Sequence, residues 1–173
     1  MQSIIRVGMP LLAVTSATDI QAASALASEI WREYYPGIIG LAQVEYMLQH
    51  LQSTDAITQQ LAAGYQYFFI SDGMQSLGYL SVLCNTRGKI LHLSKFYILQ
   101  QARRQGLGRF AFAQLEVMAK QQLLTRISLT VNKHNAPAIA AYQQLGFVIT
   151  GDITQDIGQG FIMDDYEMLK KGL

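Results

Sequence analysis

Three consecutive β-rich segments constrain the fold of this chain more than any other feature of its sequence. The segments YQYFFI, LGYLSVLC and KILHLSKFYIL, within residues 65–99, are rich in β-branched and aromatic residues. The turn-forming stretches SDGMQS and NTRG separate them. Strand-forming runs joined in this way are typical of consecutive β-hairpins. The sequence therefore predicts three antiparallel strands in the middle of the chain.

Helical patterns precede these strands. Residues 19–35 are expected to form a helix, which Thr18 and Gln21 open as a capping box and Pro36 ends. Two further helices are expected at about 41–51 and from Ser53 or Thr54 to Gly64.

An amphipathic helix is expected directly after the strands, at residues 106–122. Its apolar face consists of Leu107, Phe110, Ala111, Leu115 and Met118. Glu116 and Lys120 form an i,i+4 pair on the other face. The remaining segments read as a strand at RISLTV, a helix at APAIAAYQQL, and two strands near 147–155 and 161–169. This order predicts an α/β or α+β domain built on one sheet.

Length, charge and apolar runs limit the class of protein. The chain has 173 residues, the size of one domain, so residues 1–173 are expected to form a single domain. Its 13 basic and 12 acidic residues leave a net charge of +1, which excludes an electrostatic footprint for nucleic acid. No apolar stretch approaches the about 18 residues of a membrane helix. We therefore expect a cytoplasmic protein without nucleic-acid or membrane partners.

Two local features leave alternatives open. The segment 7–14, VGMPLLAV, is read as part of a first strand at 4–15, with a weak signal peptide as the alternative. The single cysteine, Cys84, cannot form an internal disulfide. Its place in an apolar run indicates a buried, inert thiol rather than a nucleophile.

The loop QQARRQGLG joins the third central strand to the amphipathic helix. Backbone N–H groups at a helix start bind anions, and Gly106 and Gly108 let an anion approach that backbone closely. The loop therefore suggests a diphosphate site, with a tight strand-to-helix turn as the alternative. A P-loop is excluded because Arg109 and Phe110, not Lys and Ser or Thr, follow the glycines. A dinucleotide site lacks its acidic residue, because the next strand ends in LTVNKHN.

Two blocks of the sequence resemble the acyl-CoA signatures of the GNAT N-acetyltransferase superfamily. The loop Arg103-Arg104-Gln105-Gly106-Leu107-Gly108 resembles the family's Arg/Gln-x-x-Gly-x-Gly/Ala motif. The stretch LTVNKHNAPAIAAYQQLGF resembles the second block, through Asn135, Ala138, Tyr142, Gly146 and Phe147. Both lie in the family's order and on the expected elements. The resemblance implies a GNAT-like α/β domain: a central mixed, mostly antiparallel sheet of about seven strands with helices on both faces.

The same resemblance implies how acetyl-CoA binds. The strand Phe96-Tyr97-Ile98 would pair with the pantetheine arm, and a backbone N–H near Ile98 would polarise the thioester carbonyl. Backbone amides of residues 103–108 would hold the diphosphate, and the side chains of Arg103 and Arg104 would add charge-assisted contacts. Asn135 would hydrogen-bond the cofactor arm. No metal is implied.

Tyr142 is the candidate catalytic acid. In such enzymes a neutral amine attacks the thioester, and the departing thiolate accepts a proton that a phenol can supply. The resemblance places Tyr142 near the sulfur; the alternative is a tyrosine that only packs under the sheet.

The base is not evident, because the strand HLSKFYIL carries no carboxylate where many relatives have a Glu. His92 could serve, although a histidine in an apolar strand is more often structural. A water chain, or an amine already deprotonated by its pocket, is left as the other route.

The acceptor pocket would be built from the early helices and the last hairpin. An acidic, aromatic pocket suits a cationic amine, through carboxylate pairing and cation–π contact. The candidates are Trp31, Glu33, Tyr34, Tyr35 and Asp164, together with Tyr46 in the second predicted helix and Asp165 and Tyr166 in the last strand. The alternative is that the aromatic residues belong to the core and that the aspartates mark an exposed strand end.

The sequence therefore predicts an acetyl-CoA-dependent N-acetyltransferase that acts on a small-molecule or peptide amine by direct attack in a ternary complex. The alternative is an acyl-CoA-binding sensor or adaptor without turnover. A homodimer is also expected from the low surface charge and the surface aromatic residues.

Overall fold

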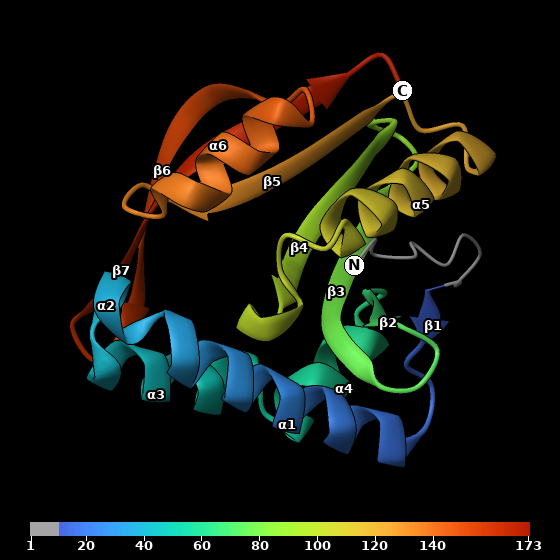
Figure 1. The fold of residues 1–173 in the computed structure, drawn as a ribbon. Coiled ribbons are helices and arrows are strands. Elements are labelled where there is room, and N and C mark those ends of the chain that lie inside the picture. Colours follow the sequence, from blue (N-terminus) through green and yellow to red (C-terminus); the bar gives the residue numbers. More distant parts are fainter. Residues whose placement is uncertain (1–10) are drawn as a thin grey trace. The chain divides into compact units, whose positions relative to one another are not determined.

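The elements follow the predicted order of a first strand, a group of helices, three strands, a helix, a strand, a helix and two strands (Figure 1). The computed structural model describes residues 11–173. The strands are β1 (Leu12–Ala13), β2 (Gln66–Ser71), β3 (Ser76–Asn85), β4 (Ile90–Ile98), β5 (Arg126–Asn132), β6 (Val148–Gly158) and β7 (Phe161–Lys171). The helices are α1 (Ala17–Tyr34), α2 (Pro36–Ile39), α3 (Leu41–Leu51), α4 (Thr54–Ala62), the 3-10 turn η1 (Gln100–Ala102), α5 (Leu107–Gln121) and α6 (Ala136–Gln144).

The strands form one seven-stranded sheet in the order β1-β2-β3-β4-β5-β7-β6. The pairs β1–β2, β2–β3, β5–β7 and β6–β7 are antiparallel, whereas β4 and β5 are parallel. This arrangement confirms the predicted α/β fold class with a mixed, mostly antiparallel sheet.

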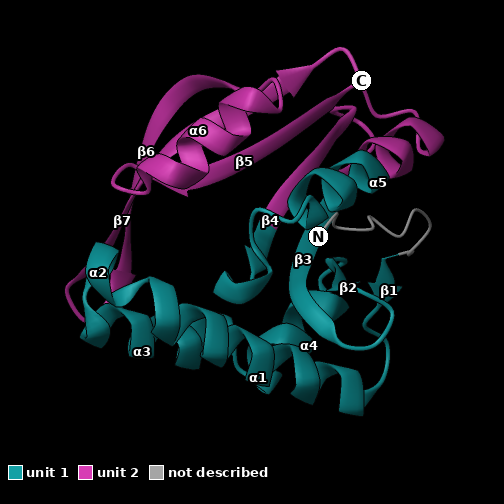
Figure 2. Cartoon of the chain, viewed as in Figure 1, with its two compact units in different colours: residues 1–83, 95–115 teal, residues 84–94, 116–173 magenta. Residues whose placement is uncertain are grey.

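The chain divides into two compact units, which Figure 2 colours separately. Unit 1 comprises residues 1–83 and 95–115, and unit 2 comprises residues 84–94 and 116–173. The single domain expected over residues 1–173 stays a prediction.

The start of α1 corrects one prediction. Ser16, not Thr18, is the N-cap: its hydroxyl accepts from the Asp19 N–H at 3.1 Å, and the Asp19 carboxylate accepts from the Ser16 N–H at 2.8 Å. Asp19 completes the box instead of Gln21 because it stands three residues after the true N-cap, and its carboxylate adds charge at the positive helix end. The helix ends at Tyr34, and Pro36 opens the short helix α2 rather than a loop.

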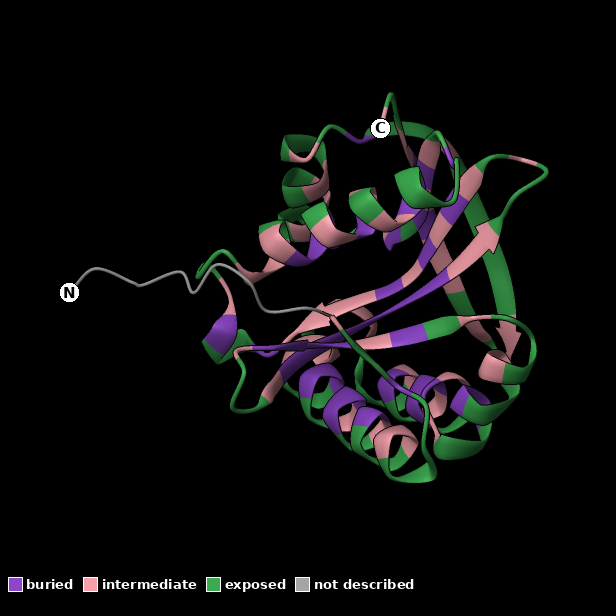
Figure 3. Ribbon diagram, turned by 90° about the vertical axis from the view of Figure 1, so that its right-hand side faces the viewer, coloured by how far each residue is buried: buried purple, intermediate pink, exposed green. Residues whose placement is uncertain are grey.

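Helices and strands pack around the core of unit 1. The buried residues of α1 recur every three or four positions, on one face: Ala23, Leu26, Ala27, Ile30 and Trp31. Figure 3 shows the same restriction of buried residues to one side of the helices. The two predicted helices that follow are confirmed, with α3 at Leu41–Leu51 and Ser53 capping α4. Gly64 lies just past α4 with φ +96°, a conformation that favours glycine.

The apolar faces of unit 2 follow its sequence pattern. In β5, Ile127, Leu129 and Val131 are buried, as alternation predicts. Pro137 lies in the first turn of α6, and Gly146 follows that helix with φ +93°. The last two strands form the predicted hairpin, β6 with β7.

Helix α5 is rotated relative to its prediction. Its fully buried residues are Ala111, Phe112, Leu115 and Ala119, whereas Phe110 and Met118 are half-buried. Glu116 does not pair with Lys120: its carboxylate accepts from the Lys170 ammonium on β7. A tertiary ion pair between half-buried partners has replaced the weak local one.

Two expectations concern the first residues and membranes. Only Leu12–Ala13 of the predicted first strand is observed, as β1. Residues 4–10 of that strand, and with them the first half of the segment read alternatively as a signal peptide, lie outside the described residues. Within the described chain, none of the helices is long and apolar enough to span a membrane.

Candidate active site

The loop between β4 and α5 turns sharply twice. Arg104 and Gly106 both adopt left-handed backbone conformations, with φ of 60° and 84°. The first hydrogen bond of α5 runs from the Phe110 N–H to the Gly106 carbonyl at 2.9 Å. The N–H groups of residues 107–109 therefore precede the first helical hydrogen bond and lie at the positive end of the helix dipole. Turns of this kind, leading into a helix start, bind phosphate groups.

Two glycines keep the loop backbone open. At Gly106 the positive φ itself favours glycine. A Cβ at Gly108 would lie 3.6 Å from Ile98 Cδ1 and 3.9 Å from Phe96 Cε1, which is ordinary contact. The packing of the protein itself therefore does not require a glycine at position 108. The residues present fit a diphosphate held by backbone amides.

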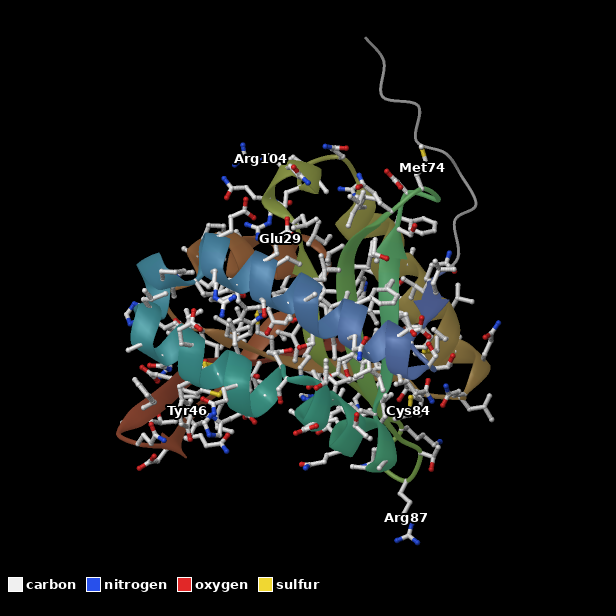
Figure 4. All side chains as sticks on the ribbon, turned by 90° about the horizontal axis from the view of Figure 1, so that it is seen from below. Glu29, Tyr46, Met74, Cys84, Arg87 and Arg104 are labelled. Carbon is white, nitrogen blue, oxygen red and sulfur yellow. The ribbon has the colours of Figure 1, made fainter. Side chains whose placement is uncertain are left out.

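The two arginines of the loop have different surroundings. Arg103 folds back: its Nε donates to the Ile98 carbonyl at 2.9 Å, and its guanidinium carbon lies 4.2 Å from the centre of the Tyr34 ring. Arg104 is exposed, and in Figure 4 its labelled side chain extends outward from the loop. Arg104 is thus the arginine that is positioned to meet an anion, while Arg103 ties the end of β4 to α1.

The end of β4 comes unusually close to β3. A Cβ on Gly78 would lie 2.4 Å from the Tyr97 carbonyl oxygen and 3.1 Å from Ile98 Cα. Because a Cβ projects out of the plane of its strand, this proximity shows that β4 rises out of the plane of β3 here. The strands stay joined through Leu99 N–H and the Leu77 carbonyl at 2.9 Å. A side chain at position 78 would therefore displace the backbone of Tyr97 and Ile98.

The parallel pairing of β4 with β5 is short. It joins Ile90–Leu93 to Arg126–Leu129, although β4 continues to Ile98 and β5 to Asn132. The regular pairing thus ends before the segment Phe96-Tyr97-Ile98 that was expected to bind the cofactor arm.

Unit 1 gathers three predicted acceptor residues into an aromatic cluster. Trp31 stacks on Tyr35 with ring centres 4.6 Å apart, and Tyr34 meets Tyr35 edge-on at 5.1 Å. Tyr97 lies 5.3 Å from Trp31 and 5.9 Å from Tyr35. Trp31 is buried and donates its Nε1–H to the Tyr79 hydroxyl at 3.2 Å. Trp31 is therefore the buried member of the cluster, whereas the rings of Tyr34, Tyr35 and Tyr97 are half-buried.

The two other candidates near the early helices have local partners. The Glu33 carboxylate is exposed and accepts from the Gln100 N–H at 3.3 Å, which links α1 to η1. Tyr46 stacks on His50, one turn along α3, at 4.1 Å. Glu33 thus lies beside the loop after β4, whereas Tyr46 contacts its own helix.

Unit 2 holds Asn135 and Tyr142. Asn135 is 3% exposed, at the start of α6, and its N–H donates to the Asn132 carbonyl at 2.9 Å. Tyr142 is half-buried and meets Phe147 edge-on at 5.7 Å. Burial raises the pKa of the Tyr142 phenol. The phenol therefore keeps its proton at neutral pH, as a general acid must.

The aspartates of β7 differ sharply. Asp164 accepts from the Lys133 ammonium at 2.7 Å, and this hydrogen bond lowers the pKa of its carboxyl. Asp165 is 6% exposed, and burial raises the pKa of its carboxyl to about 6. The sequence named both aspartates as acceptor-pocket candidates and preferred Asp164, because alternation along a strand does not show which of two adjacent aspartates becomes buried.

Three further reactive side chains have defined surroundings. His92 is half-buried, with its Nδ1 3.0 Å from the Ser128 hydroxyl, which suits the structural reading. Lys95 is 8% exposed and donates to Gln60 Oε1 at 2.7 Å; burial lowers the pKa of its ammonium to about 8. Cys84 is half-buried rather than buried, and burial raises the pKa of its thiol, which favours an inert role.

In residues 11–173, no group of His, Cys, Asp and Glu is arranged to hold a metal.

The chain matches one protein family and is similar in fold to several solved structures. Residues 25–147 match the acetyltransferase (GNAT) family. The fold resembles the PaiA N-acetyltransferase of Thermoplasma acidophilum in complex with coenzyme A, at a TM-score of 0.76 and 16% identity, covering 94% of this chain and 99% of that one. It also resembles a ribosomal-protein-alanine N-acetyltransferase from Brucella melitensis (0.67, 21%, 94% and 99%). A variant of the spermidine N-acetyltransferase SpeG from Vibrio cholerae is similar as well (0.67, 17%, 94% and 95%).

Proposed function

We propose that this chain, which belongs to the acetyltransferase (GNAT) family, transfers an acetyl group from acetyl-CoA to a primary amine by direct attack in a ternary complex. The observation that carries the proposal is the loop before α5. Its two left-handed residues and its helix-start amides form a phosphate-binding backbone, and the exposed Arg104 adds a cation.

Each residue of the proposed site has one task. The amides of residues 104–108 and the Arg104 side chain bind the diphosphate of acetyl-CoA, which supplies the activated acetyl group. The backbone of Phe96–Ile98 orients the pantetheine arm, and the Ile98 N–H stabilises the charge that develops on the carbonyl oxygen. Asn135 hydrogen-bonds the arm. Tyr142, whose phenol keeps its proton at neutral pH, supplies the proton that the thiolate needs on departure.

The acceptor is proposed only as a primary amine. The similar structures include one named for spermidine and one named for the alanine of a ribosomal protein, so both small molecules and peptide N-termini belong in the first screen. The half-buried rings of Tyr35 and Tyr97 support an aromatic wall for the acceptor pocket, whereas the Tyr34 ring already holds the Arg103 guanidinium.

Two measurements test the function. Acetyl-CoA should raise the melting temperature, and free thiol should appear when acetyl-CoA and a panel of amines are added together. A sensor without turnover would give the first result and not the second. If ATP or NAD stabilised the protein and coenzyme A did not, the proposal would be abandoned.

A pair of glycine variants tests the loop. Gly108→Leu should weaken coenzyme A binding, because its side chain occupies the space beside the loop amides. Gly37→Leu is the matched control, since a Cβ at Gly37 meets nothing within 4 Å. Equal binding by both variants would refute the diphosphate site.

The homodimer is also retained as a proposal. Edge strand β6 exposes Val148, Ile149 and Ile153, at 59%, 42% and 38%, and exposed apolar edges are sites of association. Light scattering on the purified protein gives the oligomeric state directly.

A further inference from the structure

The proposed mechanism lacks a base, and unit 2 contains a carboxylate suited to that role. We propose that Asp165 binds the ammonium group of the acceptor and removes its proton before attack. This inference rests on the acetyltransferase function proposed above. It concerns the acceptor nitrogen rather than the thioester, so an experiment can refute the role of Asp165 and leave the proposed function intact.

Asp165 is a buried acid without a paired cation. Among the described residues, the only buried side chains that carry a formal charge are Lys95 in unit 1 and Asp165 in unit 2. The neighbouring cation, Lys133, donates to Asp164 at 2.7 Å and also lies 3.6 Å from Asp152. No ion pair joins Asp165 to any residue in the range 11–173. Burying an uncompensated carboxylate is costly, so a ligand cation that paired with it would gain considerable binding energy.

Asp165 lies beside the end of β5 from which the chain continues to the helix of the proposed acid. It lies opposite Asn132, the last residue of β5. The Lys133 N–H donates to the Asp164 carbonyl at 3.1 Å, which fixes β7 to the start of the β5–α6 connection. That connection leads to Asn135 and into α6, which carries Tyr142. Unit 2 therefore places its buried carboxylate and the start of the helix that carries Tyr142 at the same end of β5.

The surroundings of Asp165 suit a base. Burial is the main cause of its raised pKa of about 6, with Asp164 raising it further and the Thr130 hydroxyl and Lys133 opposing. Its cross-strand neighbours, Asn132 on β5 and Ile153 on β6, carry no titratable group. At neutral pH the carboxylate is mostly ionised, while the Tyr142 phenol is protonated. Two groups whose pKa values are separated in this way can act as base and acid in one reaction.

The proton transfers balance as follows. The acceptor ammonium gives one proton to the Asp165 carboxylate, which leaves a neutral amine. The nitrogen lone pair forms a bond to the thioester carbonyl carbon, and the carbon–sulfur bond breaks with its electron pair on sulfur. The thiolate takes a proton from Tyr142, and the protonated nitrogen of the new amide returns one to the phenolate. Asp165 releases its proton to solvent.

The other candidates for the base are weaker. His92 directs its Nδ1 to Ser128, and Glu33 is exposed and accepts from the Gln100 backbone. Neither is buried, so neither carries an uncompensated charge that an ammonium would relieve.

The variant Asp165→Asn tests the inference with little change of shape. We expect kcat/KM for alkylamines to fall by about 10²-fold or more and the acidic limb of its pH profile, near pH 6, to disappear. Coenzyme A affinity should be unchanged. The deficit should largely vanish with trifluoroethylamine, an acceptor that is already neutral at the assay pH, because that amine needs no base. Asp156→Asn is the control, since this exposed residue of β6 caps a turn through an oxygen that asparagine retains.

Each outcome has one meaning. Wild-type activity in Asp165→Asn with an unchanged pH profile would overturn the inference and leave the proposed function intact. An equal deficit for alkylamines and trifluoroethylamine would also overturn it, because that pattern indicates a structural role. Wild-type protein that binds no coenzyme A and acetylates no amine would instead refute the proposed function itself.

Discussion

Substituting Lys95 by methionine should make the stability of the protein less dependent on pH. Lys95 is buried against Gln60 and lies 5.5 Å from the Tyr67 ring centre, with no carboxylate on its ammonium among the described residues. Burial lowers its pKa from 10.5 to about 8. At about 1.4 kcal/mol per pH unit, this shift corresponds to roughly 3 kcal/mol of unfolding free energy.

The direction follows from proton binding. Between about pH 8 and pH 10.5 the unfolded chain keeps the Lys95 proton while the folded protein has lost it. The unfolded state therefore binds more protons, and the free energy of unfolding rises with pH across this window. Below pH 8 the full cost of the buried charge is present. Methionine has a similar shape and no charge, so the variant avoids that cost at every pH.

Urea unfolding of both proteins from pH 7 to pH 10.5 measures the effect. The difference in unfolding free energy, Lys95→Met minus wild type, should be about 3 kcal/mol larger at pH 7 than at pH 10.5. All other titrating groups are shared and cancel in the difference. The exposed Lys120→Met variant should show no such trend. If this difference stayed constant with pH, the conclusion that burial lowers the pKa of Lys95 would be refuted.

Three further predictions concern the proposed site. Gly78→Ala should lower both stability and acetyl-CoA affinity, because its Cβ would collide with the Tyr97 carbonyl and move β4; unchanged calorimetric binding would contradict this. Tyr142→Phe should reduce kcat by about 10²-fold or more at unchanged acetyl-CoA affinity, and an unaltered kcat would leave Tyr142 as a packing residue. Arg104→Ala should weaken coenzyme A binding most at low salt, whereas Arg103→Ala should chiefly lower the melting temperature; the reverse pattern would show that Arg103 is the phosphate ligand.

Features set by neighbouring residues were predictable from the sequence. The bounds of α3 and the buried alternation of β5 follow from local periodicity, and the ends of α4 and α6 follow from glycines with positive φ. The sharp strand-to-helix turn before α5, which we propose binds the diphosphate, was also evident, because its glycines and the helix that follows are contiguous in sequence. The capping box of α1 was misplaced by two residues, since several polar residues near a helix start can compete for the cap.

Features set by distant residues were not predictable. Arg103 contacts Tyr34 on α1, and Glu116 pairs with Lys170 on β7, yet no local pattern relates these partners. The same holds for burial of Lys95 and Asp165, which depends on the strands and helices packed around each one. Ionised side chains are usually exposed, so composition and alternation favoured exposure at both positions. The candidate base therefore required the structure.

A crystal structure with bound acetyl-CoA would test the central claim most directly. The account predicts diphosphate density on the backbone amides of residues 104–108, with the guanidinium of Arg104 close to it. Density for the diphosphate at any other part of the chain, with this loop empty, would contradict the account.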